Sequence, residues 1–289
     1  VLGAALMGSR RFDDFVRTTL LQKTTLSDRL QRLVEDGCLR KTAYSSHASR
    51  FEYRLTRKGV ELYDIALMTL AWEKRWDARS AARYRVALTH VDCGHETVPV
   101  LIDAATDTEV SIDTVRREPG PGEGFVLARH RRRRRQAEGV TLRQSETVFP
   151  SRINGIIGDR WSALLLRSMF DGLSRYDELL RDMAVATNIL TDRLKTLTEA
   201  GLIERSADGD GEYVLTAPGR DTYPIFLIIM RWGDRWCAAP EGPPVVVHQG
   251  AARQPVELAI VCSHCHGPLN VANVSFGVVE IDHRAPVSA

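Results

Sequence analysis

This sequence has few cysteines, no long hydrophobic run and little net charge of either sign. No stretch approaches the ~18 consecutive apolar residues of a membrane helix, and the N-terminus lacks the charged-then-apolar pattern of a secretory signal. The five cysteines lack the even spacing of a disulfide framework. With 44% apolar and 26% charged residues, the 289-residue chain has the composition of a soluble globular protein of about two domains. We therefore predict a cytoplasmic protein that makes no membrane contact.

One helix with its flanks occurs twice. Leu190 to Arg205 reads LTDRLKTLTEAGLIER, and Leu26 to Lys41 reads LSDRLQRLVEDGCLRK. The leucines recur at helical spacing, and a glycine then ends each pattern where a left-handed cap is favoured. Self-similarity at a fixed spacing indicates a repeat architecture.

The similarity extends over most of both halves. Residues 11–41 align with 175–205 at an offset of 164 without a gap. The offset then falls to 160, so that the Tyr-x-Leu-Thr segment at 53–56 matches 213–216. Repeat two is therefore four residues shorter before this segment. Val1 aligns with Leu165, so either the true N-terminus is missing or repeat one has lost half of its first helix.

Each repeat is expected to fold as three helices, a hairpin and a long trailing helix. The elements predicted in repeat one are a helix end at 1–7, a helix at 11–17, a third helix capped by Thr24 or Thr25, strands at 38–42 and 51–55, and a long helix from Thr56 through Trp76. This is a winged helix, which presents its third helix to the major groove of DNA and places its wing beside the backbone.

Several motifs are more specific than this geometry. They are GDRWS at 158–162, RYDEL at 175–179, Leu-x-x-Arg-Leu-x-x-Leu, Tyr-x-Leu-Thr and RWGDRW at 231–236. In this order they resemble the HxlR family of bacterial transcription regulators. The resemblance implies a DNA-binding regulator, usually a homodimer, without enzymatic activity.

The expected fold class is mainly α with small β (α+β), in which two winged helix-turn-helix domains stand in tandem and each is followed by a small β-rich, zinc-ribbon-like tail. The predicted domains are a first repeat with a truncated first helix at 1–87, a tail at 88–117, a Pro/Gly and Arg-rich linker at 118–150, a second repeat at 151–239 and a second tail at 240–289.

The resemblance places DNA recognition on the third helix and the wing. The candidates in repeat one are Lys23, Thr24, Thr25, Ser27, Arg29, Arg32, His47 and Arg50. Their counterparts in repeat two are Thr187, Asn188 and Arg193. The alternative is that these side chains form only a solvated helix face.

The two repeats differ in charge. Residues 1–89 hold 17 Lys or Arg against 10 Asp or Glu, whereas residues 151–247 hold 11 against 14. The second wing, SADGDGEY, is short and acidic. Because phosphate neutralisation supplies much of DNA affinity, we predict that repeat one reads DNA and that repeat two mainly pairs or regulates. The rival interpretation is a protein-interaction, small-molecule or redox-sensing scaffold built from winged helices that no longer read DNA.

The tails carry complementary halves of a metal-ligand pattern. The first contains His90, Cys93 and His95, and the second contains Cys262 and Cys265. Structural zinc takes four thiolate or imidazole ligands, so one tail alone supplies too few. Three hypotheses remain: decay without metal, one composite zinc site that staples the repeats together, and a dithiol redox switch at Cys262 and Cys265.

Two further segments carry predictions. The linker holds a basic run, Arg129, Arg131, Arg132, Arg133, Arg134 and Arg135, which is either a solubilising segment or a sequence-independent phosphate contact. The aromatic trailing helices predict either an intrachain pseudo-dimer or a homodimer, although an ordinary core explains the same residues. A small-molecule effector is possible. An enzyme is set aside because no orienting carboxylate accompanies the His and Cys residues.

Overall fold

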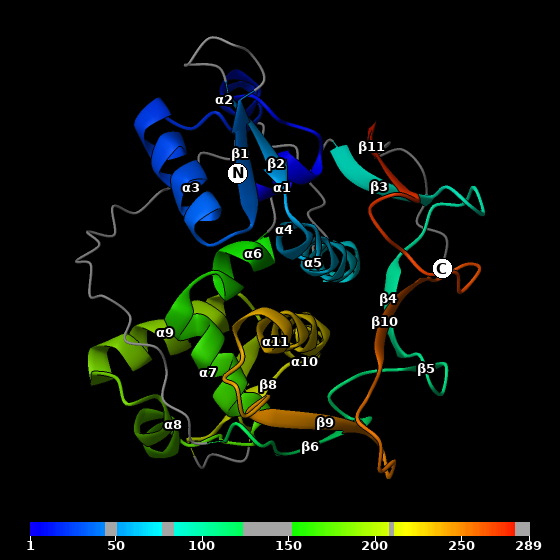
Figure 1. Cartoon of the computed structure of the whole chain (residues 1–289). Coiled ribbons are helices and arrows are strands. Elements are labelled where there is room, and N and C mark those ends of the chain that lie inside the picture. The colour runs from blue at the N-terminus through cyan, green and yellow to red at the C-terminus, as the bar shows by residue number, and fades with distance from the viewer. Residues whose placement is uncertain (44–50, 77–83, 124–151, 208–210, 281–289) are drawn as a thin grey trace.

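The chain contains two winged-helix repeats, each followed by strands (Figure 1). The computed structural model describes residues 1–43, 51–76, 84–123, 152–207 and 211–280. Repeat one contains α1 (Leu2–Leu6), α2 (Phe12–Thr19), α3 (Lys23–Glu35), β1 (Leu39–Ala43), β2 (Phe51–Leu55), α4 (Arg57–Val60) and α5 (Tyr63–Trp76). Repeat two contains α6 (Arg152–Ile157), α7 (Arg160–Phe170), α8 (Tyr176–Met183), α9 (Thr187–Glu199), β7 (Ile203–Arg205), β8 (Tyr213–Leu215), α10 (Ala217–Arg220) and α11 (Tyr223–Cys237). The predicted fold class of tandem winged helices is confirmed.

The repeated leucines form the cores of the two helix-turn-helix units. In repeat one, Leu26 and Leu30 of α3 are fully buried with Phe15 of α2 in a small separate core. In repeat two, Leu190 and Leu194 of α9 belong to the larger core that also includes α5 and α11. The helical spacing therefore identified the buried face of both helices.

Two predictions about helix ends are wrong. The helix α3 begins at Lys23, so Thr24 and Thr25 lie inside its first turn and do not cap it. The residue before the helix, Gln22, makes no side-chain cap either. The predicted long helix from Thr56 to Trp76 is two helices, α4 and α5, with a turn at residues 61–62. Thr56 does cap the first of them, because its hydroxyl accepts the Gly59 amide at 3.1 Å.

The Tyr-x-Leu-Thr segment ends in a close backbone contact in both repeats. The Thr56 hydroxyl donates to the Gly37 carbonyl at 2.6 Å, and the Thr216 hydroxyl donates to the Gly201 carbonyl at the same distance. A Cβ on Gly59 would lie 2.0 Å from the Cys38 carbonyl oxygen. Only glycine therefore allows α4 to pack against the start of the wing.

The helices α5 and α11 lie together at the centre of the molecule (Figure 1) and hold the repeats in a reciprocal pairing. Trp72 Nε1 donates to the Pro218 carbonyl at 2.8 Å, and Trp232 Nε1 donates to the Lys58 carbonyl at 3.0 Å. Because these pairs are exchanged by the offset of 160 that relates the repeats, the interface is isologous, like that of a twofold dimer.

A second set of contacts repeats this exchange. Trp76 Nε1 donates to Asp221 Oδ2 at 2.8 Å, and Trp236 Nε1 donates to Glu61 Oε2 at 2.6 Å. Each carboxylate also pairs with an arginine of the other repeat, at 2.9 Å for Arg75–Asp221 and 3.2 Å for Arg235–Glu61. Each repeat therefore gives the other an equivalent set of contacts within one chain.

The two tails form one interleaved β unit. The first contributes β3 (Tyr84–His90), β4 (Pro99–Asp103), β5 (Thr108–Glu109) and β6 (Val115–Pro119), and the second contributes β9 (Val245–Gln249), β10 (Leu258–Cys262) and β11 (Val274–Glu280). Antiparallel ladders join β3 to β11, β4 to β10 and β6 to β9. The first strand of each tail therefore pairs with the last strand of the other, and β4 and β10 pair in the middle.

The lengths and composition of the helices bear on membrane contact. Among the described residues, none of the helices has the length and apolar character needed to cross a bilayer.

Candidate functional site

The outer face of α3 carries most of the predicted DNA-binding side chains of repeat one. Leu26 and Leu30 anchor the helix in the core, which leaves the opposite face in solvent. Thr25 is half-buried, and five candidates are exposed: Lys23, Thr24, Ser27, Arg29 and Arg32. Within the part of the chain that the structure describes, Lys23, Arg29 and Arg32 pair with no carboxylate. These cations are available to a phosphate backbone.

The equivalent face of α9 is less basic. The counterpart of Lys23 is the exposed Thr187, and the counterpart of Arg32 is the half-buried Thr196. On the strand that follows, the exposed Arg40 of β1 corresponds to the exposed Glu204 of β7. Lys195 reverses the difference at one position, where repeat one has Gln31.

The one arginine predicted on α9 is engaged inside repeat two. Arg193 Nη1 lies 3.4 Å from Asp159 Oδ1, and its Nη2 lies 2.7 Å from Asp192 Oδ2. Asp159 also caps α7 by accepting the Ser162 amide at 2.9 Å. Two acids therefore already neutralise Arg193, whereas Asn188, at the start of the same helix, is exposed.

The remaining DNA-contact predictions cannot be placed. His47 and Arg50 of the first wing, together with the arginines from 129 to 135, lie outside the described residues. In Figure 1, α3 and α9 both lie on the left of the view, away from β3, β4, β10 and β11 on the right. The two candidate recognition helices therefore share one side of the molecule.

A cluster of four potential metal ligands forms where the tails meet. His90 is the last residue of β3 and Cys93 lies in the turn after it, while Cys262 is the last residue of β10 and Cys265 lies in the turn after that strand. Their ligand atoms all lie within 4.8 Å of one another. The sulfur atoms of Cys93 and Cys262 are 3.9 Å apart, and His90 Nδ1 is 3.2 Å from the sulfur of Cys265. The tertiary structure thus brings together residues that the two tails hold separately in sequence.

His95 lies at the rim of this cluster. Its ring stacks on His264 with centroids 3.6 Å apart, and its Nδ1 is 2.7 Å from the Cys93 carbonyl oxygen. With Cys93, these two histidines form a second and more exposed group that could hold a metal ion. Sequence reasoning missed His264, and the only signal was its place inside the Cys-Ser-His-Cys segment.

Local hydrogen bonds favour the thiolate form of Cys262. Burial by itself raises the pKa of this thiol, but hydrogen bonds from Thr97, Cys265 and His264 outweigh burial and lower the pKa to about 6. The His264 amide lies 3.4 Å from the Cys262 sulfur. The deprotonated thiol is the form that binds metals.

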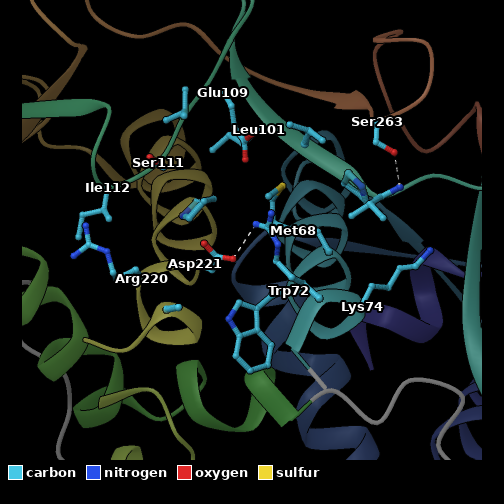
Figure 2. A pocket seen from close by; sticks show the side chains of 18 of the residues that line it. Met68, Trp72, Lys74, Leu101, Glu109, Ser111, Ile112, Arg220, Asp221 and Ser263 are labelled. Carbon is cyan, nitrogen blue, oxygen red and sulfur yellow. Dashed lines mark hydrogen bonds and ion pairs between the residues drawn. The ribbon is translucent and has the colours of Figure 1, made fainter. Parts of the chain in front are cut away.

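A cavity of about 560 Å³ lies between α5, the strands β4 and β5, and α10. Figure 2 shows Trp72 and Met68 of α5 on one wall and Asp221 of repeat two on another. Arg75 reaches across to Asp221. The volume lies in the usual range of small-molecule sites, and such sites favour domain interfaces.

The two winged-helix repeats match a known protein family. The model of the HxlR-like helix-turn-helix family matches residues 1–81 and 156–241. The chain belongs to the HxlR-like helix-turn-helix family. Because the two matched regions coincide with the two repeats, the predicted tandem arrangement is confirmed. The tails lie outside both regions.

Individual transcriptional regulators resemble parts of the chain. An uncharacterized HTH-type transcriptional regulator of Mycobacterium bovis, Mb3122, is 34% identical over 124 residues, which cover 42% of this chain and 78% of that protein. The regulator YybR of Bacillus subtilis is 32% identical over 27% of this chain and 67% of its own. The solved structure of PA1607, a putative transcription factor, has 32% identity and a TM-score of 0.40 and covers 44% of this chain and 93% of that one.

Proposed function

We propose that this protein is a DNA-binding transcriptional regulator that acts as a repressor. In this proposal α3 of repeat one and the adjacent wing read the major groove, and repeat two serves mainly for pairing and regulation. Family membership and the regulators named above support DNA binding. The observation that carries the division of labour is the difference in charge between the exposed faces of α3 and α9.

The physical argument rests on phosphate neutralisation. Lys23, Arg32 and Arg40 are exposed cations in repeat one, whereas the corresponding positions of repeat two hold two threonines and a glutamate. Each phosphate that a protein neutralises steepens the salt dependence of binding by about 0.9 in a log–log plot. Lys195, opposite Gln31, reduces the surplus of repeat one to two cations, and a surface with this surplus binds DNA more tightly at low salt.

The reciprocal contacts of α5 and α11 bear on the number of protein chains that bind one DNA site. Since one chain already contains the paired arrangement of a twofold dimer, we propose that a single chain occupies each DNA site and reads it with α3. A homodimer with four winged helices is the competing arrangement. Light scattering of the protein–DNA complex separates the two, because the complex contains one chain in the first case and two in the second.

The function is tested by fluorescence anisotropy on DNA from upstream of the protein's own gene, beside an unrelated duplex and at several salt concentrations. Lys23→Ala/Arg32→Ala is expected to weaken binding by about 30-fold or more, since each good contact contributes about 1–3 kcal/mol. The matched variant Thr187→Ala/Thr196→Ala is expected to change affinity less than about threefold. Repression is read separately, as lower output of a reporter placed behind the same DNA.

Other outcomes would redirect the proposal. Equal losses in the two double variants would assign DNA reading to both repeats. Equal binding to both duplexes would leave a non-specific basic protein. No binding at low salt would favour the interaction or sensing scaffold instead.

The cavity in Figure 2 favours a regulatory role for a small molecule. Its walls include Trp72 and the pair Arg75–Asp221, which also join the two repeats. An effector bound there would therefore change the contacts that set the spacing of α3 and α9. Screening of metabolites by Trp fluorescence tests this, with Trp72→Phe expected to remove the signal.

The arginine run supplies a further, sequence-independent element of the proposal. Six arginines among residues 129–135 would contact phosphates near the site that α3 reads. Replacing them with glutamine is expected to weaken binding to both duplexes equally, which a solubilising linker would not do. Such a protein would act in the cytoplasm, associated with the nucleoid through its DNA.

A further inference from the structure

We propose that His90, Cys93, Cys262 and Cys265 bind one structural zinc ion that joins the two tails. Three thiolates and one imidazole are a usual ligand set for structural zinc. Bond lengths of about 2.3 Å to sulfur and about 2.0 Å to nitrogen imply ligand atoms roughly 3.5–3.8 Å apart in a tetrahedron. The separations of 3.9 Å between the sulfurs of Cys93 and Cys262 and 3.2 Å between His90 Nδ1 and the sulfur of Cys265 bracket this range.

The histidine is held in the orientation that metal binding requires. His90 Nδ1 faces the sulfur of Cys265, while its Nε2 lies 3.2 Å from Asp92 Oδ2. Asn273 in turn donates to the same carboxylate oxygen at 2.9 Å. A carboxylate behind the far nitrogen of a ligand histidine fixes its tautomer and leaves the near nitrogen free to bind the ion. His90 is almost fully buried, with 1% of its surface exposed.

Both turns have the form of a metal-binding knuckle. The Gly94 amide donates to the His90 carbonyl at 2.8 Å, and the His266 amide donates to the Cys262 carbonyl at 3.0 Å. The residue after each second ligand has a left-handed backbone, with φ of 72° at Gly94 and 56° at His266. These turns point both ligands of a pair toward the same place.

Glycine at position 267 completes the second turn. Its amide lies 3.4 Å from the Cys265 sulfur, so it can donate to the thiolate. A Cβ on this residue would lie 3.0 Å from Cε1 of His90 and 3.3 Å from the Cys265 sulfur. A larger residue would therefore push the two half-sites apart.

The exchange of strands explains why each tail holds only half of the pattern. One end of the β unit combines the first half of tail one with the second half of tail two, and all four ligands are present there. The other end would combine His248 and Ala251 of tail two with Ala104 and Asp107 of tail one, and it contains no thiol. If each tail had lost ligands independently of the other, the remaining four ligands would not be expected to fall in one site. Instead, one complete four-ligand site is retained and the ligands of the other are lost.

The proposed ion has a mechanical consequence that is independent of DNA reading. The turn after β3 and the turn after β10 lie far apart in the chain, and they belong to tails that follow different repeats. An ion that binds only the folded arrangement stabilises it. Zinc would therefore secure the β unit beside the α5–α11 pairing and would hold the two winged helices in one assembly.

The test starts with the full chain, purified under reducing conditions without oxygen. Metal analysis is expected to find about one zinc ion per chain, as for a closed four-ligand site. After the zinc is removed, cobalt(II) is expected to produce the intense visible bands and thiolate charge-transfer absorption of a tetrahedral site. Zinc removal is also expected to lower the melting temperature by about 5 °C or more.

Matched variants assign the ligands. Cys262→Ser and His90→Gln are expected to lose the ion, while His248→Gln, at the counterpart of His90, and Cys237→Ser are expected to keep it. Asp92→Ala keeps all four ligands, and it should weaken zinc binding by about 10- to 100-fold in competition with a chelator. That variant tests the site even where loss of a ligand prevents folding.

Two results would overturn the proposal. One is a wild-type chain that holds no zinc and produces no tetrahedral cobalt spectrum after reduction. The other is full zinc content in Cys262→Ser and His90→Gln, which would place the ion elsewhere, for example at Cys93, His95 and His264. Neither result bears on whether α3 reads DNA, so this inference and the proposed function fail separately.

Discussion

The two repeats exchange equivalent hydrogen bonds where they face each other and differ in charge where they face outward. At their interface Trp72 and Trp232 make the same hydrogen bond to the opposite repeat, at 2.8 Å and 3.0 Å. On the outer helices, Lys23 and Arg32 of α3 correspond to threonines of α9. A paired arrangement requires complementary contacts from both partners, so the loss of a side chain on one side removes a contact of the other. DNA contacts carry no such mutual requirement, and one copy can lose charge while the other keeps it.

The largest expected effect tests the interface. Trp72→Ala should lower the free energy of unfolding by about 3–5 kcal/mol, because a buried Trp leaves a large cavity. Its side chain is buried at 4% exposure, whereas Trp232 is half-buried, so Trp232→Ala should cost less, about 2 kcal/mol. Urea denaturation of the two variants measures both values. Equal losses in the free energy of unfolding would mean that Trp72 and Trp232 contribute equally to stability despite their different burial.

The glycines after the Tyr-x-Leu-Thr segments should respond alike. A Cβ would lie 2.0 Å from a carbonyl oxygen at Gly59 and 1.9 Å at Gly219. Gly59→Ala and Gly219→Ala are each expected to destabilise the protein by about 3 kcal/mol, since the backbone must move. Gly233→Ala is the control, because its Cβ would meet nothing within 4 Å and α11 should gain about 0.5–1 kcal/mol. Thermal melting that shows a loss in only one repeat would contradict the equivalence of the two wings.

Grafting charge tests the outward difference directly. Thr187→Lys/Thr196→Arg/Glu204→Arg places the basic side chains of repeat one on repeat two. Affinity for DNA at low salt should rise about tenfold, and the salt slope should steepen by up to about 0.9 for each new phosphate contact. Anisotropy titrations over a salt series measure both quantities. If affinity and slope stay unchanged, α9 does not face DNA in the complex.

The smallest effect concerns two equivalent tyrosines. Tyr63 and Tyr223 begin α5 and α11, and their buried hydroxyl groups have no hydrogen-bond partner among the described protein atoms. Burial also raises the pKa of both groups. Tyr63→Phe and Tyr223→Phe should leave stability unchanged or raise it by up to about 1 kcal/mol, since a buried unpaired hydroxyl costs free energy. A clear loss in either variant, measured by urea denaturation, would reveal a partner for that hydroxyl.

Local sequence patterns predicted the elements better than their ends. The leucine spacing located α3 and α9 because a helix that buries one face carries apolar residues at helical spacing in its sequence. The start of α3 was missed because the residue before it, Gln22, makes no side-chain cap that would mark it. The turn at residues 61–62 was missed because it contains neither glycine nor proline. The pairing of Arg193 with Asp159 was missed because the two residues lie far apart in the sequence.

The sequence by itself determined the repeat, the winged-helix pattern, the difference in charge and the ligand types in each tail, because composition and local periodicity record all four. Only the tertiary structure decided which half-sites meet. Two β-rich tails can each fold on themselves or exchange strands, and local hydrogen bonding favours neither. The ladders between β3 and β11 and between β4 and β10 settle the matter. They bring His90 and Cys93 to Cys262 and Cys265 from distant parts of the chain.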